Sequence, residues 1–314
     1  MTPYPAVVAE RLDELGEFGL VAAVTRGAGP PPAGPGDDAA VVPAPDGRVV
    51  ATTDVLVEGR HFRLDWSAPY DVGRKAAAQN LADVAAMGAR PTALLVGFGA
   101  PPDFAAADAV ELARGLADEA AACGASVVGG DVVAAPCVVV SVTALGSLDG
   151  RAPVLRSGAR AGDVVVVAGS LGGAAAGLAA LRAGRPDLAA VAAHRVPAPP
   201  YAAGVALATA GATAMIDVSD GLSGDLAHVA RASGVGIEVD VAALPVHPAV
   251  AAAAAALGVD EQEWVLGGGD DHALVATLPL RSAGEWPVVG RVVAEPGVRW
   301  LGARVEPASW EHFG

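Results

Sequence analysis

Aspartates recur along this 314-residue chain in short motifs that could bind cations and phosphate groups. Asp83 interrupts an apolar stretch, KAAAQNLADVAAMGARP, at residues 75–91. Carboxylates repel one another and are costly to bury unless cations hold them. The acids therefore predict several Mg²⁺ ions held by oxygen ligands, an arrangement that suits phosphoryl transfer. The other motifs are Gly-Asp-Asp at 36–38, Thr-Thr-Asp at 52–54, Gly-Gly-Asp at 129–131 and Asp-Val-Ser-Asp at 217–220.

Two of these motifs are expected at a turn and within a strand of the first half. Asp38 follows a glycine turn and leads into a strand, and a plain turn would also explain it. Asp54 lies in the β-type run 49–57, where aspartate is disfavoured. With the hydroxyls of Thr52 and Thr53 beside it, Asp54 predicts a ligand cluster for a hard cation. A charge on an edge strand is the alternative.

A helix is expected to carry Asp83. Its composition is rich in alanine, Asn80 and Asp83 share one face, and Gly88 with Pro91 supplies a stop signal. The sequence alone leaves open whether Asp83 binds a cation or lies on a solvated face. Lys75 is the sole lysine of the chain, so it is a candidate ion partner or cap, although its role stays open.

The second half repeats the alternation of strands, glycine turns and helices. Strand 164–168 leads through Gly169–Gly173 into a helix that extends to residue 183, which suggests a phosphate-binding turn or simple helix-start packing. Asp217, Ser219 and Asp220 follow a buried strand end. Helix capping explains one or two of these residues, but not so many carboxylates together. We expect two domains, 1–148 and 149–314, each an α/β (α+β) unit with a mixed sheet covered by helices.

Composition excludes several classes of protein. A formal net charge of −15 argues against nucleic acid as a partner. Although the mean hydropathy is +0.45, glycine or proline breaks the longest uncharged runs, 164–181 and 196–216, so no membrane span is expected. Early charges and the lack of a signal-like apolar segment predict a cytoplasmic protein. The two cysteines lack CxxC spacing and the six histidines lack zinc-site spacing.

The motifs, taken in order, resemble the thiamine-monophosphate kinase family. They are GDDAAVV, TTDVLVEGRHF, the stretch around Asp83, GGD, LRSGARAGD, MIDVSDGLSGDL, GGGDDHAL and the closing WEHFG. They run from about residue 17 to residue 314, so the resemblance covers almost the whole chain. It implies an aminoimidazole ribonucleotide synthetase-like fold and a homodimer. The implied reaction is ATP-dependent phosphorylation of thiamine monophosphate to thiamine diphosphate, with ATP near the domain junction.

The resemblance also implies roles for individual residues. Asp83, Asp131, Asp217 and Asp220 would be the catalytic acids. The Mg²⁺ ligands would be Asp38, Thr52, Thr53, Asp54, Asp83, Asp131, Asp217 and Asp220. ATP would contact Gly130, Asp131, Arg156 and Ser219, and thiamine monophosphate would contact His61, Asp270 and Trp310.

One motif departs from the family. The usual Gly-Gly-Glu-Asp-Tyr-Glu-Leu reads Gly-Gly-Asp-Asp-His-Ala-Leu at residues 268–274, which puts the fit of the substrate at Asp270 in question. Two alternatives remain. The chain could be a non-catalytic module that binds nucleotide or thiamine diphosphate, which its acid set disfavours. It could also be another ATP-dependent enzyme of the superfamily, although the loop 27–36 lacks the lysine or cysteine that two of those enzymes need.

Overall fold

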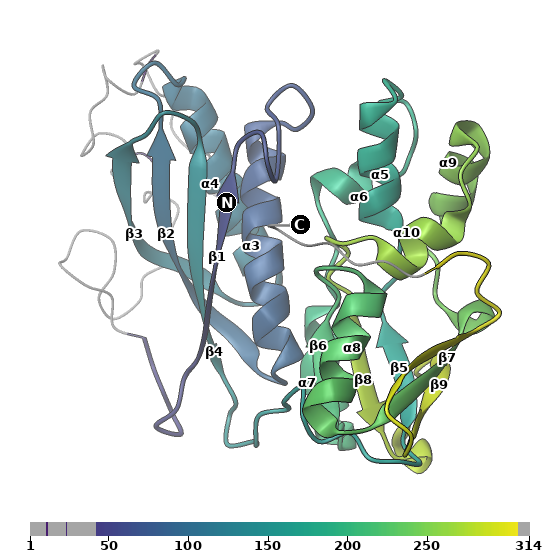
Figure 1. The fold of residues 1–314 in the computed structure, drawn as a ribbon. Coiled ribbons are helices and arrows are strands. Elements are labelled where there is room, and N and C mark those ends of the chain that lie inside the picture. The colour runs from purple at the N-terminus through teal and green to yellow at the C-terminus, as the bar shows by residue number, and fades with distance from the viewer. Residues whose placement is uncertain (1–10, 12–22, 24–41, 307–314) are drawn as a thin grey trace. The chain divides into compact units, whose positions relative to one another are not determined.

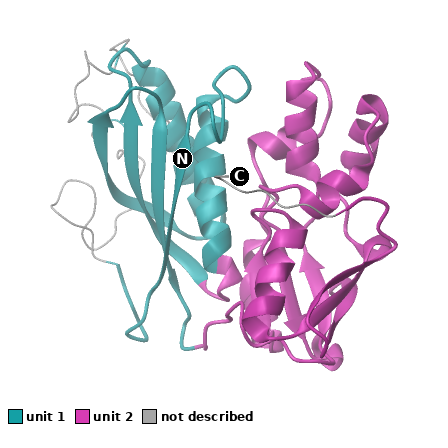
Figure 2. Ribbon diagram, viewed as in Figure 1, with its two compact units in different colours: residues 1–84, 90–150 teal, residues 85–89, 151–314 magenta. Residues whose placement is uncertain are grey.

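The computed structural model describes residues 11, 23 and 42–306 (Figure 1). The chain divides into two compact units (Figure 2). Unit 1 comprises residues 1–84 and 90–150, and unit 2 comprises residues 85–89 and 151–314. The division lies two residues after the boundary expected from the sequence, and the short segment 85–89 belongs with unit 2.

Unit 1 contains a four-stranded mixed sheet of order β1-β4-β2-β3. Strands β2 and β3 are parallel, whereas the pairs β1·β4 and β2·β4 are antiparallel. The edge strands are therefore β1 and β3. The strands are β1 Val50–Val57, β2 Arg90–Ala100, β3 Ser126–Ala134 and β4 Val139–Ser147.

Helices α3 (Pro69–Ala86) and α4 (Ala106–Ala122) cover one face of this sheet (Figure 1). Alternate residues of β4, at positions 140, 142 and 144, are buried on that face. Arg74 Nε donates a 2.8 Å hydrogen bond to Oε2 of Glu119, which links the two helices. Helix α3 begins before the stretch expected from the sequence and carries Asp83 in its last turn.

Among the described residues of unit 1, no helix covers the other face of the sheet, called the open face below. On this face, the exposed fractions of Val55, Leu95 and Val133 are 46%, 38% and 55%. The strand pairing places them on the same side as Thr53, because Thr53 lies opposite Thr143 and Thr143 lies opposite Leu95. The sheet thus has one covered face and one face with exposed apolar side chains.

Unit 2 contains a six-stranded mixed sheet of order β10-β7-β9-β5-β8-β6. Among the described strands of this sheet, only β7 and β10 pair in parallel, and the other pairs are antiparallel. Together with the mixed sheet of unit 1, this confirms the expected fold class. The strands are β5 Val164–Ala168, β6 Ala214–Asp217, β7 Gly236–Asp240, β8 Leu274–Leu278, β9 Val288–Val293 and β10 Gly297–Leu301.

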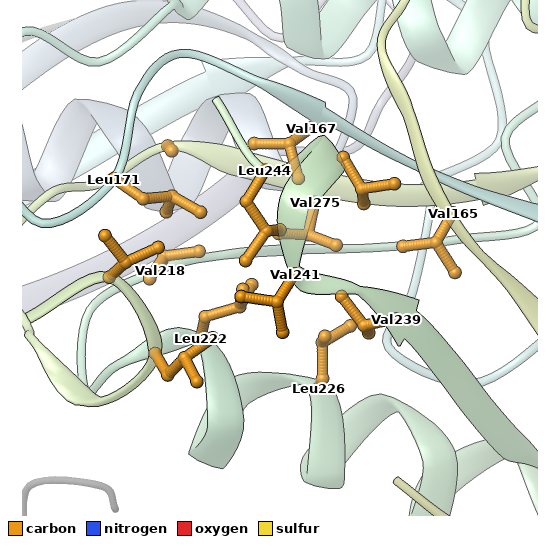
Figure 3. Close-up of a cluster of buried hydrophobic side chains, with 14 of the residues drawn as sticks. Val165, Val167, Leu171, Val218, Leu222, Leu226, Val239, Val241, Leu244 and Val275 are labelled. Carbon is orange, nitrogen blue, oxygen red and sulfur yellow. The ribbon is translucent and has the colours of Figure 1, made fainter. Parts of the chain in front are cut away.

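Helices cover both faces of the unit 2 sheet. Every residue of β5 and β8 is buried, which requires cover on both sides. Leu207 of α7 packs with one face, and Leu222 and Leu226 of α8 pack with the other. Figure 3 shows Leu222 and Leu226 directed toward Val239 and Val241. The helices are α5 Gly173–Arg182, α6 Val191–Arg195, α7 Tyr201–Ala210, α8 Leu222–Ser233, α9 Val250–Leu257 and α10 Glu261–Gly267, with 3-10 turns η1 Val241–Ala243 and η2 Leu280–Ser282.

The strand expected at 164–168 and the helix that follows it are confirmed. Short elements without a strong local pattern, such as α6, α10 and β10, were not predicted. No helix in the described part of the chain is both long enough and apolar enough to cross a membrane.

Candidate active site

A group of oxygen-bearing side chains joins β1 to α3 in unit 1. Thr52 Oγ1 donates a hydrogen bond to Oδ2 of Asp83 at 2.7 Å. One turn away on α3, Oδ1 of the buried Asn80 accepts the backbone N–H of Asp54 at 3.0 Å. Asn80 thereby satisfies a backbone N–H of the edge strand β1. Thr52, Asp54 and Asp83, which the sequence marks as candidate ligands, lie close together in the structure.

The side chain of Thr53 does not join this group. Its Oγ1 donates to the carbonyl of Val142 at 3.0 Å and accepts from Thr143 Oγ1 at 3.2 Å. Successive residues of a strand point to opposite faces, so three consecutive ligands cannot direct their side chains to one cation. We therefore correct the expectation that the hydroxyl of Thr53 shares a cation with Thr52 and Asp54.

Asp131 is also separate from this group within unit 1. It lies inside β3, and strand β3 is the edge opposite β1. Three strand spacings amount to about 14 Å. The pairing of Asp131 with Gly97, of Gly97 with Ser141 and of Ser141 with Val55 places its side chain on the open face. Its Oδ1 accepts the N–H of Val132 at 2.9 Å.

Gly130 is required by the sheet itself. A Cβ at this position would lie 2.0 Å from the carbonyl oxygen of Val96, beside the irregularity in β2 at Leu94 and Leu95. Any larger residue would force β2 and β3 apart. The glycine is therefore explained by the close approach of β2, without reference to a nucleotide.

His61 is held in the turn that follows β1. The ring nitrogen Nδ1 accepts the backbone N–H of Val57 at 3.0 Å, and the backbone N–H of His61 donates to the carbonyl of Val57 at 3.0 Å. Because Nδ1 is an acceptor, the neutral ring carries its proton on Nε2. The partly buried imidazole can thus offer an N–H to a ligand.

In unit 2, the loop after β6 and the loop before β8 pair through their backbones. The N–H of Asp270 donates to the carbonyl of Ser219 at 2.9 Å, and the N–H of His272 donates to the carbonyl of Val218 at 2.8 Å. A Cβ at Gly269 would lie 2.4 Å from the carbonyl oxygen of Ser219. Two motifs separated by about 50 residues therefore form one rigid surface that carries Asp217, Ser219, Asp220 and Asp270.

Two carboxylates hold the loops of this surface in place. Asp225 Oδ2 accepts the N–H groups of Ser219 and Asp220 at 3.1 and 3.3 Å. The two oxygens of Asp271 accept the N–H groups of Gly172 and Ala174, which brings in the glycine turn before α5. The sequence did not assign these roles. An acid in the first turn of a helix, a few residues after a strand end, is the signal that could have suggested the role of Asp225.

Both holding carboxylates have raised pKa values. Burial raises the pKa of Asp225 to about 7, and the negative charges of Asp217 and Asp220 add to the effect. Burial also raises the pKa of Asp271 to about 6, while the two backbone N–H groups act in the opposite direction. The charges of Asp217 and Asp220 that contribute to the shift of Asp225 would also favour the approach of a cation.

Asp217 accepts a hydrogen bond from a histidine. Nδ1 of His272 lies 3.0 Å from Oδ2 of Asp217, and both side chains are buried. His272 has a positive φ of 52°, as does Asp270 with 64°, so the segment has the left-handed backbone that is uncommon outside glycine. The sequence flagged His272 only as a departure from the family motif.

Arg156, Asp38 and Trp310 are the remaining residues that the sequence assigned to the site. The carbonyl of Arg156 accepts from Ser233 Oγ at 3.2 Å, at the C-terminal end of α8, whereas Ser219 and Asp220 precede its N-terminal end. Helix α8 has 12 residues and spans about 18 Å. The backbone of Arg156 is thus anchored away from Asp220, although its side chain is exposed. Asp38 and Trp310 lie outside the described residues.

The donors fit a hydrated magnesium ion better than a closed metal site. In the described part of the chain, no three His, Cys, Asp or Glu side chains are arranged to enclose a cation. Mg²⁺ usually binds one or two carboxylates and keeps waters and substrate phosphates as its other ligands. Asp54 and Asp83 in unit 1, and Asp217 and Asp220 in unit 2, offer such hard oxygen donors.

Comparison with known proteins identifies the family. Residues 36–148 match the family model of the AIR synthase related protein N-terminal domain, and residues 160–300 match the C-terminal domain of the same family. Thiamine-monophosphate kinase of Mycobacterium tuberculosis is 52% identical over 98% of this chain and 95% of its own length. The chain belongs to the thiamine-monophosphate kinase family.

Other family members agree in sequence and structure. Thiamine-monophosphate kinase of Corynebacterium glutamicum is 43% identical over 89% of this chain and 86% of its own length. The solved structure of AaThiL complexed with AMPPCP and TMP superposes with a TM-score of 0.80 and 32% identity. That superposition covers 98% of this chain and 100% of AaThiL. The expected aminoimidazole ribonucleotide synthetase-like fold of a thiamine-monophosphate kinase is confirmed.

Proposed function

We propose that the protein transfers the γ-phosphoryl group of ATP to thiamine monophosphate, which yields thiamine diphosphate and ADP. The observation that carries this proposal is the similarity, along 98% of the chain, to AaThiL complexed with AMPPCP and TMP. AMPPCP is an analogue of ATP. The kinases of the same name that are 52% and 43% identical support the same substrate.

The chemistry requires little from the protein beyond positioning and charge neutralisation. The acceptor is an ionised phosphate oxygen, already a competent nucleophile, so a general base is unnecessary. The main barrier is the repulsion between two anions. Several bound Mg²⁺ ions would supply the neutralising charge. Transfer is direct and in line, without a phosphoenzyme, so the configuration at a chiral γ-phosphorus inverts.

The residues take the roles that the family motifs imply, with one change. Asp83, Asp131, Asp217 and Asp220 are the acids of the reaction, and Asp38, Thr52 and Asp54 complete the oxygen ligands. The hydroxyl of Thr53 is left out because it points to the open face of the sheet. Gly130, Asp131, Arg156 and Ser219 bind ATP, while His61, Asp270 and Trp310 bind thiamine monophosphate. The Nε2–H of His61 suits a phosphate oxygen.

We further propose a homodimer formed through the open face of unit 1. Exposed apolar side chains on a sheet face favour a partner surface, and a second copy carries the same face. Asp131 lies on this face, at the edge of the sheet opposite Asp83. Val133→Arg would place a charge on the face, and loss of the dimer in light scattering is the expected result.

A cytoplasmic location is part of the proposal. Cys123 and Cys137, the two cysteines, are both free thiols, as expected in a reducing compartment.

The test is ADP release measured with and without thiamine monophosphate at varied Mg²⁺ concentrations. We expect release that requires both thiamine monophosphate and Mg²⁺. Asp83→Asn should reduce turnover about a hundredfold or more, because it removes a carboxylate that would hold Mg²⁺ at the reacting phosphates, while thermal unfolding stays near that of the wild type. Nucleotide binding without turnover would instead favour the non-catalytic module.

A further inference from the structure

His272 contacts Asp217 where the two paired loops of unit 2 meet, and both side chains are buried. The distance between Nδ1 and Oδ2 is 3.0 Å, and the exposed fractions of the two residues are 4% and 2%. A hydrogen bond to an ionised group that is shielded from water is worth more than one at the surface. The orientation of the Asp217 carboxylate therefore depends on His272.

The backbone fixes His272 as firmly as it fixes Asp217. Asp217 ends β6, and Val218 exchanges hydrogen bonds with the segment that carries His272: its N–H donates to Ala273, and its carbonyl accepts from His272. Both bonds measure 2.8 Å. The imidazole thus reaches Asp217 from a neighbouring backbone segment held in register, which leaves the pair little freedom to rearrange.

The direction of the hydrogen bond leaves one carboxylate oxygen for another ligand. An ionised carboxylate can only accept, so Nδ1 of His272 carries the proton and donates to Oδ2. Oδ1 is then the oxygen that remains for a cation. A bond of this kind both fixes a ligand carboxylate and determines which of its oxygens faces the ion.

We propose that His272 is a positioning residue that orients Asp217 so that Oδ1 faces the magnesium ion of the bound nucleotide. This inference rests on the proposed function, because that function makes Asp217 a ligand. Family members usually have tyrosine at this position. A tyrosine hydroxyl lies farther from its backbone than Nδ1 of histidine, so a tyrosine offers no donor at the position that Nδ1 occupies here.

The test uses two variants that tolerate the positive φ of residue 272. His272→Gly removes the donor and suits a φ of 52°, and His272→Asn places an amide N–H close to the position of Nδ1. Binding of AMPPCP, measured by calorimetry at varied Mg²⁺ concentrations, reports metal-dependent binding without turnover. Circular dichroism and thermal unfolding establish that each variant is folded.

We expect His272→Gly to raise the Mg²⁺ concentration for half-maximal AMPPCP binding by about tenfold or more, and His272→Asn to restore it to within about threefold of the wild type. In an Asp217→Asn background, where the carboxylate is absent, His272→Gly should add little further effect. A merely structural role would change thermal unfolding but leave the Mg²⁺ dependence unaltered.

Three results would overturn the proposal. They are an unchanged Mg²⁺ dependence in folded His272→Gly, no restoration in folded His272→Asn, or AMPPCP binding by the wild type that does not depend on Mg²⁺. The proposed function is tested separately by turnover. A wild-type protein that binds AMPPCP with Mg²⁺ but does not phosphorylate thiamine monophosphate would contradict that function, while the comparison of the variants would still decide the role of His272.

Discussion

The hydroxyl of Thr52 donates a 2.7 Å hydrogen bond to Oδ2 of Asp83, and it joins an edge strand to a helix 31 residues later in the chain. The bond fixes the Asp83 carboxylate against β1 near Asp54. Thr52→Val keeps the shape of the side chain but removes the donor. We expect the Mg²⁺ concentration that supports half-maximal activity to rise by about tenfold, with a loss of stability of about 1 kcal/mol.

Thr53 provides the matched control in the adjacent position. Its hydroxyl bonds Val142 and Thr143 on the other face of β1. Thr53→Val should therefore leave the Mg²⁺ dependence within about twofold of the wild type, since the side chain of Thr53 points to the face of β1 opposite Thr52 and Asp54. Equal losses in the two variants would contradict the assignment of the two faces.

The close pairing of the two loops of unit 2 predicts that one added methyl group at Gly269 lowers activity strongly. In Gly269→Ala, the new Cβ would lie 2.4 Å from the carbonyl oxygen of Ser219, so the loops must separate. Because Ser219 and Asp270 flank this contact, we expect kcat/KM to fall about a hundredfold. The measurement is steady-state kinetics with thiamine monophosphate as the varied substrate.

Gly97→Ala is the control for that substitution. A Cβ at Gly97 meets its nearest atom, Cβ of Ser141, at 3.6 Å, which is an ordinary contact. Because Gly97 pairs with Asp131, the quantity to compare is the free energy of unfolding, which should stay within about 1 kcal/mol of the wild type. Wild-type kinetics in Gly269→Ala would show that the two loops need not keep their spacing.

The buried carboxyl of Asp271 predicts a pH-dependent stability. Its pKa in the folded protein is about 6, above the ordinary value of 3.8, so the folded state favours the protonated form. Its contribution to stability is fully present below the unfolded value of 3.8 and is lost as the pH rises through 6, by on the order of 3 kcal/mol. Above about pH 7 the contribution changes no further.

Asp271→Asn removes this titration. Its amide can accept only one of the two N–H groups that Asp271 accepts, so the variant should be less stable than the wild type at pH 4. Urea unfolding at pH 4, 5, 6 and 7.5 should show this deficit shrinking by about 2 kcal/mol. A deficit that is constant with pH would refute the raised pKa of Asp271.

Local sequence patterns predicted much of the fold and of the acid set. The apolar run of β5 and the alanine-rich composition of α3 are strong local signals, and both elements are present. The motifs also placed Asp217, Ser219 and Asp220 at a strand end, where they lie. Short α6 and α10 were missed because a few residues carry too little periodicity to identify a helix.

The contacts that orient the candidate site could not be read from local patterns. The bond between Asp217 and His272 spans 55 residues and depends on the register between two loops. The position of Asp131 depends on strand order, since β3 lies at the far edge from β1 although both carry an aspartate. Alternation along β1 was predictable and separates Thr53 from Thr52, but the family motif treats the two threonines alike.

The most direct measurement follows the γ-phosphorus of ATP. The purified protein is incubated with Mg²⁺, thiamine monophosphate and ATP labelled at the γ-phosphorus, and the products are separated. The account predicts that the label appears in the terminal phosphate of thiamine diphosphate, in a one-to-one ratio with ADP. Label found only in inorganic phosphate, or label that remains in ATP, would contradict it.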